Sequence, residues 1–362
     1  MLNVSFAVTR CHSNLATGES VTMPNPRRRE SIDTAAFHPV IVVGAARSGT
    51  TLLTVMLDRH SRVSMPPETQ FFTEYLPQLE KHHWSKSVDS IVDSAVKFQR
   101  IADLGLEHSA ICARTKQYGR TPAGLFRALL ECYAEKQAAS RVGEKTPGHN
   151  AHVDTIIKAY PYAKIIALVR DGRAVVNSKM SAPWAIPGNP RRFWLFCWNW
   201  VVQMRLIIRH QRRYGTDKIL TVNYEDLVQE PQAQLKRICR FIDEPFEPRM
   251  LDSSISSDSV PDWEEGWKAK AKTGLDTRRL QGWRKERSQQ EIWAMNTIMG
   301  PMLRRFGYTD ANLADCPIGV KAKLLPLIAL RLTVSRPIIV TLLRGMRAVG
   351  LDKGIASLNE SY

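Results

Sequence analysis

The sequence predicts an α/β fold of three layers, in which a central parallel β-sheet is flanked by helices. Two near-continuous apolar runs, residues 40–43 and 163–169, have the composition of strands that are buried on both faces. Each run ends in a glycine-containing loop that leads into a segment with helical apolar periodicity. Repeated strand–loop–helix units form parallel sheets, and 362 residues suffice for one large domain.

The first of these loops carries a motif for binding anions. Gly44, Gly49 and Thr51 have nearly the spacing G-x-x-x-x-G-K-[ST] of a phosphate-binding loop, but Thr50 stands where that pattern has its lysine. A strand, a glycine loop and a helix in this order aim backbone N–H groups at an anion. The nearest cation is Arg47, inside the loop. We therefore expect a phosphate-like group here, without the Mg²⁺–ATP chemistry in which that lysine acts on the transferred phosphate.

The other expected elements follow in chain order. They are a short strand at 61–65, a mainly helical region at 73–140, strands at 141–145 and 218–223, and helices at 191–214, 231–242 and 291–306. The helix at 191–214 contains three tryptophans and is apolar most of the way round, so we expect it to be buried in the core rather than to form an aromatic platform for a substrate.

A second anion motif follows the apolar run 163–169. Arg170 stands at the end of this strand, and Ser178 follows eight residues later in the next helix. A guanidinium is a planar fork that suits phosphate oxygens, and a serine hydroxyl adds another donor. Both motifs lie at strand–helix junctions, so in a parallel sheet they meet at the same edge.

These motifs resemble those of sulfotransferases, which use 3′-phosphoadenosine-5′-phosphosulfate (PAPS). The segment 47–52, Arg-Ser-Gly-Thr-Thr-Leu, resembles their 5′-phosphosulfate loop, most closely in bacterial and protein-tyrosine sulfotransferases, and Arg170 with Ser178 resembles their 3′-phosphate motif. The resemblance extends over about residues 38–310 and implies a P-loop-like fold, PAPS as co-substrate and no metal. It implies these nucleotide-binding residues: Arg47, Ser48, Gly49, Thr50, Thr51, Arg170, Ser178, Tyr224, Arg284 and Lys285.

The last three of these residues come from two segments further along the chain. Tyr224 begins a Tyr-Glu-x-Leu segment that is very similar to one near the adenosine in family members. Arg284 and Lys285 belong to the basic segment 276–287, which resembles the loop that closes over the 3′-phosphate.

The resemblance also implies catalytic residues. Glu68 follows Pro66-Pro67 and lies 21 residues after Arg47, as does the proposed base of tyrosine-sulfating enzymes. A general base must accept the proton of the attacking hydroxyl. Lys145 matches the lysine that the family carries at a strand end, and with Arg47 it would stabilise charge on the sulfuryl group and the leaving phosphate. His149 is the alternative base, since cytosolic sulfotransferases use a histidine just after this lysine.

Composition restricts the partners. The net charge of +16 predicts an anionic ligand or surface, but no nucleic-acid-binding motif is present. The six cysteines have no C-x-x-C pair, and His82, His83 and His108 have no partners at metal-ligand spacing. We therefore expect no metal site and a reduced, cytoplasmic compartment.

We expect three regions: a flexible polar and basic tail at 1–36, the sulfotransferase domain at 37–312 and a basic amphipathic helical extension at 313–362. The start lacks the apolar core of a signal peptide. The segment 324–349 is apolar but contains four arginines and two prolines. It fits two helices lying on the anionic inner face of a membrane, or else a helix packed on the domain or at a dimer interface.

The predicted reaction is in-line sulfuryl transfer to a hydroxyl of a glycan, a lipid-linked molecule or a small molecule. Protein tyrosine is a weaker expectation, because Pro66-Pro67 replaces the cysteine that precedes the glutamate in tyrosine-sulfating enzymes and the start shows no anchor. Two alternatives stay open: a small-molecule kinase with a degenerate P-loop, and a nucleotide-binding or membrane-surface protein without catalysis. The acceptor and the oligomeric state do not follow from the sequence.

Overall fold

The fold is seen in a computed structural model, which describes residues 37–80, 82–182, 190–264 and 275–308, together with residues 318, 319 and 322. All of them belong to one compact unit, Asp33–Tyr362. The predicted tail at 1–36, the segment 324–349 and nearly all of the extension 313–362 lie outside the described residues. Within the described ranges, no helix has the length and hydropathy needed to cross a bilayer.

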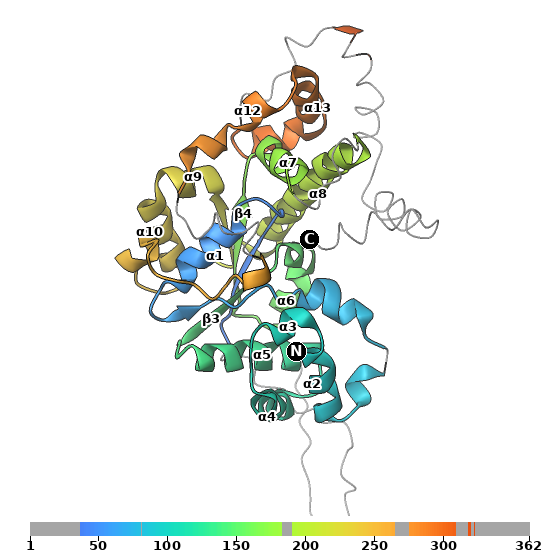
Figure 1. Ribbon diagram of the computed structural model, residues 1–362, viewed down its shortest axis with the longest axis vertical. Helices are drawn as coiled ribbons and strands as arrows, with labels where there is room; N and C mark the ends of the chain where they lie inside the picture. Colours follow the sequence, from blue (N-terminus) through green and yellow to red (C-terminus); the bar gives the residue numbers. More distant parts are fainter. Residues whose placement is uncertain are drawn as a thin grey trace, which may run out of the picture. The chain divides into compact units, whose positions relative to one another are not determined.

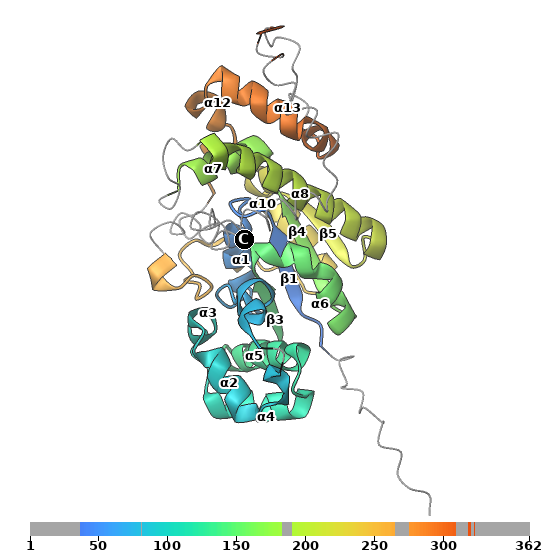
Figure 2. The same cartoon turned by 90° about the vertical axis from the view of Figure 1, so that its right-hand side faces the viewer.

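A parallel sheet of five strands forms the centre of this unit (Figures 1 and 2). The strands are β1 (Val40–Gly44), β2 (Val63–Ser64), β3 (Arg141–Lys145), β4 (Lys164–Val169) and β5 (Ile219–Asn223). Their order is β2-β3-β1-β4-β5, and every pair is parallel. Val42 of β1 lies opposite both Lys145 and Ile166. The loop after β1 therefore opens between the ends of β3 and β4, at the edge where open α/β sheets bind ligands.

Helices surround the sheet. The longer ones are α1 (Thr50–Asp58), α2 (Val88–Val96), α4 (His108–Tyr118), α5 (Pro122–Lys136), α6 (Val153–Ala159), α7 (Gly172–Met180), α8 (Pro190–Tyr214), α10 (Pro231–Phe241) and α13 (Gln289–Arg305). Short helical segments include η1 (Phe71–Tyr75), α3 (Gln99–Ala102), η4 (Pro147–His152), α9 (Tyr224–Gln229), η6 (Asp262–Glu264) and α12 (Trp283–Glu286). This arrangement confirms the predicted fold class.

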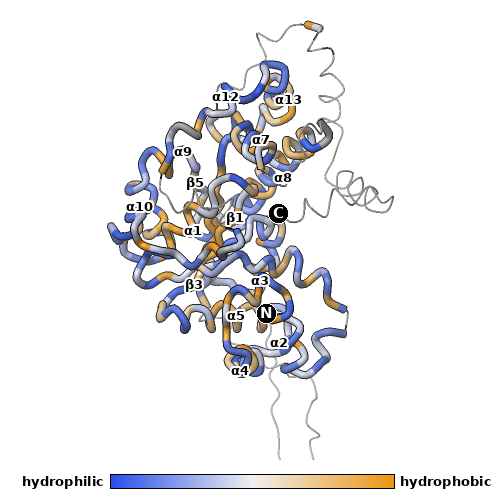
Figure 3. Tube along the Cα trace, viewed as in Figure 1, coloured by the Kyte–Doolittle hydropathy of each residue, from blue (hydrophilic) through white to orange (hydrophobic). Residues whose placement is uncertain are grey.

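Alternating residues of the strands face two separate cores, which accounts for the three layers. Ile41 and Val43 belong to a core that includes residues of α5, α6, α7, α8 and α13. Val40 and Val42 belong to a second core with α1, α9 and α10. Strands covered on both faces need apolar residues at every position, which explains the continuous apolar runs. Helices such as α8 and α13 instead alternate between hydrophobic and hydrophilic residues along their length (Figure 3).

The tryptophan-rich helix α8 packs in the core, as its composition predicts. Trp200 is fully buried, and its indole N–H donates a hydrogen bond of 3.1 Å to the carbonyl oxygen of Arg170. Helix α8 packs against α7 and α13 (Figure 2). It thereby fixes the backbone at the end of β4, where the second anion motif begins.

Candidate active site

The loop after β1 presents an open helix N-terminus. Gly49 precedes α1 at φ 94°, no side chain caps the helix there, and its first turn has no acidic residue. Its N–H groups and dipole therefore remain available for an anion. Arg47 adopts φ 73°, a conformation that non-glycine residues rarely take and that clusters at functional sites. The hydroxyl of Ser48 is buried and donates to the carbonyl of Ala45 at 2.6 Å, so it holds the loop together.

Tyr224 joins this loop to the end of β4. Its ring packs so closely on Gly49 that a Cβ atom there would lie 2.2 Å from the ring. The same ring lies 4.5 Å from the guanidinium carbon of Arg170, a cation–π contact. Arg170 in turn donates a hydrogen bond of 3.1 Å to the carbonyl oxygen of Arg47. Three residues that the sequence assigned to nucleotide binding therefore form one contact chain with Gly49.

The two anion motifs are in direct side-chain contact. Nε of Arg47 lies 3.2 Å from Oγ of Ser178 and donates to it, across 131 residues of sequence. Lys179, the next residue of α7, is buried, and its ammonium donates to Oδ1 of Asn199 at 3.2 Å. Burial, together with the charge of Arg47, lowers the pKa of Lys179 to about 8. The sequence does not single out this lysine, because a single cation inside an amphipathic helix has no distinguishing pattern.

A buried carboxylate and a buried ammonium meet at the start of α1. Oε1 of Glu68 forms an ion pair with Nζ of Lys145, and Nζ also donates to Oγ1 of Thr51 at 3.3 Å. The amide of Gln70 donates to Oε2 of Glu68 at 3.2 Å. Gln70 has φ 49°, so a second non-glycine residue with positive φ stands in the site. The candidate base and candidate catalytic lysine thus lie together at the start of α1.

Glu144, next to Lys145, organises a separate buried network. Its carboxylate accepts hydrogen bonds from Thr69 at 2.9 Å, from Thr146 at 2.6 Å and from Nδ1 of His149 at 2.8 Å. Burial alone would raise the pKa of Glu144, but His149 and these hydrogen bonds hold the pKa below its ordinary value. Nε2 of His149 accepts a hydrogen bond of 3.2 Å from the backbone N–H of Phe72. Both ring nitrogens of His149 are therefore used within the protein.

The basic segment near α12 reaches α7 through a residue that the sequence did not single out. Arg284 and Lys285 are exposed, and Arg284 lies 4.5 Å above the ring of buried Trp283. Arg287 instead donates from Nε to Oδ1 of Asn177 at 2.5 Å, directly before Ser178. Arg287 therefore lies next to Ser178. Only the fold could show this, because segment 276–287 contains five basic residues and nothing in the sequence tells them apart.

The donor set of the site suits a nucleotide with two separate anionic groups. Arg47 contacts Arg170 and Ser178, the charge of Arg47 acts on Lys179, and Lys145 contacts Thr51 at the start of α1. Guanidinium groups bind phosphate oxygens bidentately, and an open helix N-terminus binds a further anionic group. The residues present therefore fit PAPS, with its phosphosulfate and its separate 3′-phosphate.

Comparison with known proteins decides the family, since the sulfotransferase family profile matches residues 39–248, more than half of the chain. The chain belongs to the sulfotransferase family. It is 28% identical over 280 residues to protein-tyrosine sulfotransferase A of Caenorhabditis elegans, covering 75% of this chain and 67% of the relative. It is 30% identical over 220 residues to the Drosophila melanogaster protein-tyrosine sulfotransferase, covering 59% of this chain and 40% of the relative.

Two solved structures share the fold. The sulfotransferase domain of the Synechococcus PCC 7002 olefin synthase aligns with a TM-score of 0.53 and 24% identity, over 75% of this chain and 96% of that domain. The sulfotransferase domain of the curacin biosynthetic pathway aligns with a TM-score of 0.52 and 18% identity, over 75% of this chain and 98% of that domain. The predicted family and fold are confirmed, and sulfuryl transfer from PAPS to a hydroxyl, the predicted enzyme class, is the reaction of this family.

Proposed function

We propose that this chain transfers the sulfuryl group of PAPS to an acceptor hydroxyl, with Glu68 as the general base. The observation that carries the proposal is the contact of Glu68 with Lys145, which also reaches Thr51 at the start of α1. A base and a cation in contact, next to an anion-binding helix terminus, suit a reaction that removes a proton from the nucleophile and places negative charge on the leaving group.

The nucleotide would be held by both halves of the loop region. We assign the 5′-phosphosulfate to the loop Arg47, Ser48, Gly49, Thr50 and Thr51, whose N–H groups begin α1. We assign the 3′-phosphate to Arg170 and Ser178. The packing of Tyr224 on Gly49 and Arg170 supports a place for Tyr224 beside the adenosine.

When bound, PAPS supplies an activated sulfuryl group. Glu68 would accept the acceptor's hydroxyl proton at Oε1 or Oε2. Lys145 and Arg47 would hold positive charge near the oxygens on which negative charge develops, and because both are fixed before the reaction, little reorganisation is needed. The bound geometry would bring the hydroxyl in line with the leaving phosphate.

The geometry favours Glu68 over His149 as the base. Nδ1 of His149 is bound to the buried carboxylate of Glu144, and Nε2 accepts from the backbone N–H of Phe72. A histidine with both nitrogens occupied has no lone pair free for an acceptor proton. Oε2 of Glu68 is bound by the side-chain amide of Gln70, a neutral donor that can yield to a hydroxyl.

The acceptor is a hydroxyl-bearing molecule, and its identity is a proposal. A glycan, lipid-linked or small-molecule hydroxyl is the class predicted from the sequence. A tyrosine of a protein is the second candidate, because the relatives named above are protein-tyrosine sulfotransferases. Transfer of radiolabelled sulfate from PAPS to tyrosine peptides, glycans and lipid extracts in parallel would distinguish them. The cytoplasmic location and the contact of segment 324–349 with an anionic membrane stay predictions.

Calorimetry tests the nucleotide site. We expect 3′,5′-adenosine bisphosphate, the product left after transfer, to bind with micromolar affinity and ATP to bind far more weakly. Arg170→Ala should abolish this binding, whereas Arg240→Ala, which removes an exposed arginine of α10, should leave it unchanged. Tighter, Mg²⁺-dependent binding of ATP would restore the kinase alternative. Binding of neither nucleotide would favour a protein without catalysis.

A further inference from the structure

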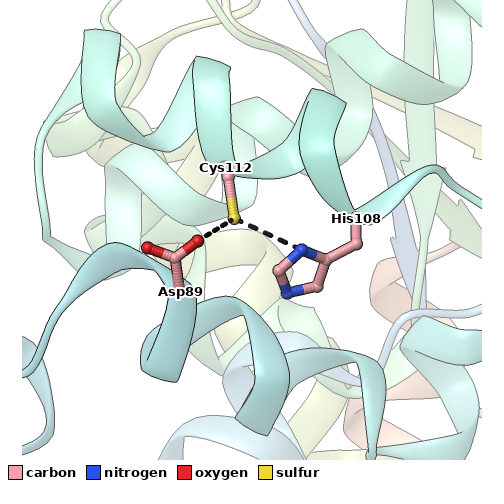
Figure 4. A group of neighbouring side chains, drawn as sticks. All are labelled: Asp89, His108 and Cys112. Atoms are coloured by element: carbon pink, nitrogen blue, oxygen red, sulfur yellow. Dashed lines mark hydrogen bonds between the residues drawn. The ribbon is translucent and has the colours of Figure 1, made fainter.

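Three side chains that could bind a metal ion converge on the helices α2 and α4. Asp89 lies in the first turn of α2, and His108 and Cys112 lie one helical turn apart on α4. In Figure 4 the carboxylate, the imidazole and the thiol point toward one another from these two helices. Residues at i and i+4 share one face of a helix, so α4 presents its nitrogen and its sulfur to Asp89 together.

The separations match those between ligands of one tetrahedral ion. Sγ of Cys112 lies 3.6 Å from Nδ1 of His108 and 3.6 Å from Oδ1 of Asp89. Zinc bonds of about 2.3 Å to sulfur and about 2.0–2.1 Å to nitrogen or oxygen, at the tetrahedral angle, place such ligand atoms about 3.6 Å apart. All three ligand atoms lie within 4.8 Å of one another, which allows them to share one ion.

The hydrogen-bond inventory also favours a cation among these atoms. Nε2 of His108 lies 2.9 Å from Oδ1 of Asp93, which can only accept when ionised, so Nε2 carries a proton. In the neutral imidazole this leaves a lone pair on Nδ1, facing Cys112. The thiol has one proton for two acceptors, Nδ1 and the carboxylate of Asp89. A metal ion satisfies all three atoms at once, whereas the thiol proton satisfies one.

We propose that Asp89, His108 and Cys112 form a zinc site with three protein ligands. Thiolate and imidazole ligands select zinc over magnesium or calcium. Asp93 holds the far nitrogen of His108, the outer-shell arrangement that orients metal-binding histidines. Asp89 is exposed, so water can complete the tetrahedron. The ion joins α2 to α4 and stabilises their packing, and it takes no part in the proposed sulfuryl transfer.

Sequence spacing gives no sign of this site. The expectation of no metal rested on the lack of partners near His108, but Asp89 comes 19 residues earlier in the chain. Only the packing of α2 against α4 brings it into reach. The His-x-x-x-Cys spacing on one helix face is too common to indicate a site by itself.

Zinc titration of the metal-stripped full chain tests the proposal. We expect one zinc equivalent to bind in calorimetry and the melting temperature to rise with added zinc. Cobalt(II) in place of zinc should give a thiolate-to-metal charge-transfer band in the near ultraviolet. Cys112→Ser and His108→Ala should each lose the bound zinc equivalent, the cobalt charge-transfer band and the rise in melting temperature. His82→Ala, which removes an exposed histidine, should keep all three.

Asp93→Asn separates a positioning role from a ligand role. It should keep the cobalt thiolate band but weaken zinc binding about 10- to 100-fold. Circular dichroism of each variant without metal shows whether it is folded. If the folded Cys112→Ser protein binds as much zinc as the unmodified chain, or if cobalt gives no thiolate band, the site does not exist. If only misfolding accounts for a loss, Asp89→Asn, at an exposed position, gives the deciding measurement.

Discussion

The carboxylate of Glu68 and the ammonium of Lys145 form a buried ion pair at the start of α1, and the side chains are 9% and 0% exposed. One partner comes from the loop after β2 and the other from the end of β3. Parallel pairing of these two strands, with Val63 opposite Arg141, brings the two segments together. The pair therefore depends on the sheet, and it places a proton acceptor beside a fixed cation.

Glu68→Gln should lower turnover about 100- to 10,000-fold, the range for loss of a general base, because an amide cannot accept the hydroxyl proton. Binding of 3′,5′-adenosine bisphosphate should change little, since the nucleotide is assigned to other residues. Steady-state kinetics with labelled PAPS, paired with calorimetry, measure both quantities. Unchanged turnover would remove Glu68 from its proposed role, and His149 would be examined next.

The sheet and the two anion motifs could be predicted from local sequence, because buried parallel strands and glycine loops have local signatures. The motif alone does not predict the hydrogen bond of Ser48, whose hydroxyl donates to a backbone carbonyl within the loop. Lys179 and Arg287 could not be found, because their relevance arises from contacts across the fold: the charge of Arg47 acts on Lys179, and Asn177 contacts Arg287. Local sequence cannot report which of several cations a helix turns inward.

Lys179 should make nucleotide binding depend on pH. Its pKa is about 8 because of burial and the nearby charge of Arg47. A bound phosphate favours the ammonium form, so binding should take up a proton near pH 8 and weaken by up to about tenfold for each pH unit above it. Calorimetry of 3′,5′-adenosine bisphosphate in buffers of different ionisation enthalpy measures the uptake. In Lys179→Met the uptake should vanish, and if it persists, another group is responsible.

Arg287→Ala should weaken binding of the same nucleotide more than Arg284→Ala does. Arg287 contacts Asn177, next to Ser178, whereas Arg284 is exposed and stacks on Trp283. Loss of a charge-assisted contact near the proposed 3′-phosphate site should cost about 1.5–3 kcal/mol, or roughly 10- to 150-fold in affinity. Comparison with adenosine 5′-phosphate, which lacks the 3′-phosphate, is the control, and its affinity should be the same in all three proteins. If both variants lose affinity equally, or if Arg284→Ala loses more, the result would favour binding of the 3′-phosphate by the residues predicted from the sequence.

Gly49→Ala should damage the loop in two separable ways. A methyl group would meet the Tyr224 ring at 2.2 Å, and φ 94° is a conformation that residues with a Cβ atom rarely adopt. We expect the free energy of unfolding to fall by more than about 1 kcal/mol and nucleotide binding to weaken. Adding Tyr224→Ala removes the collision but not the strain at φ 94°. The double variant should therefore lose less free energy of unfolding than the two single variants lose together. If the losses in free energy of unfolding, measured in urea, simply add, the contact with the Tyr224 ring is not the cause of the damage.

His149→Ala should act on stability more than on chemistry. Glu144 is fully buried, and its pKa is held low by His149 and by hydrogen bonds against the opposing effect of burial. Removing His149 leaves a buried carboxylate without its ring donor, which costs at least about 1–3 kcal/mol for a buried group left without a hydrogen-bond partner. Because the folded-state pKa lies below the unfolded value of 4.5, the stabilisation from Glu144 is present above pH 4.5 and is lost as the pH falls through the folded-state pKa. Urea unfolding at pH 7 and at pH 4 should therefore show a smaller difference between the unmodified chain and His149→Ala at the lower pH. His82→Ala serves as the control. If His149 has a structural role, the folded fraction of His149→Ala should retain turnover, whereas loss of turnover in folded molecules would indicate that His149 is the base.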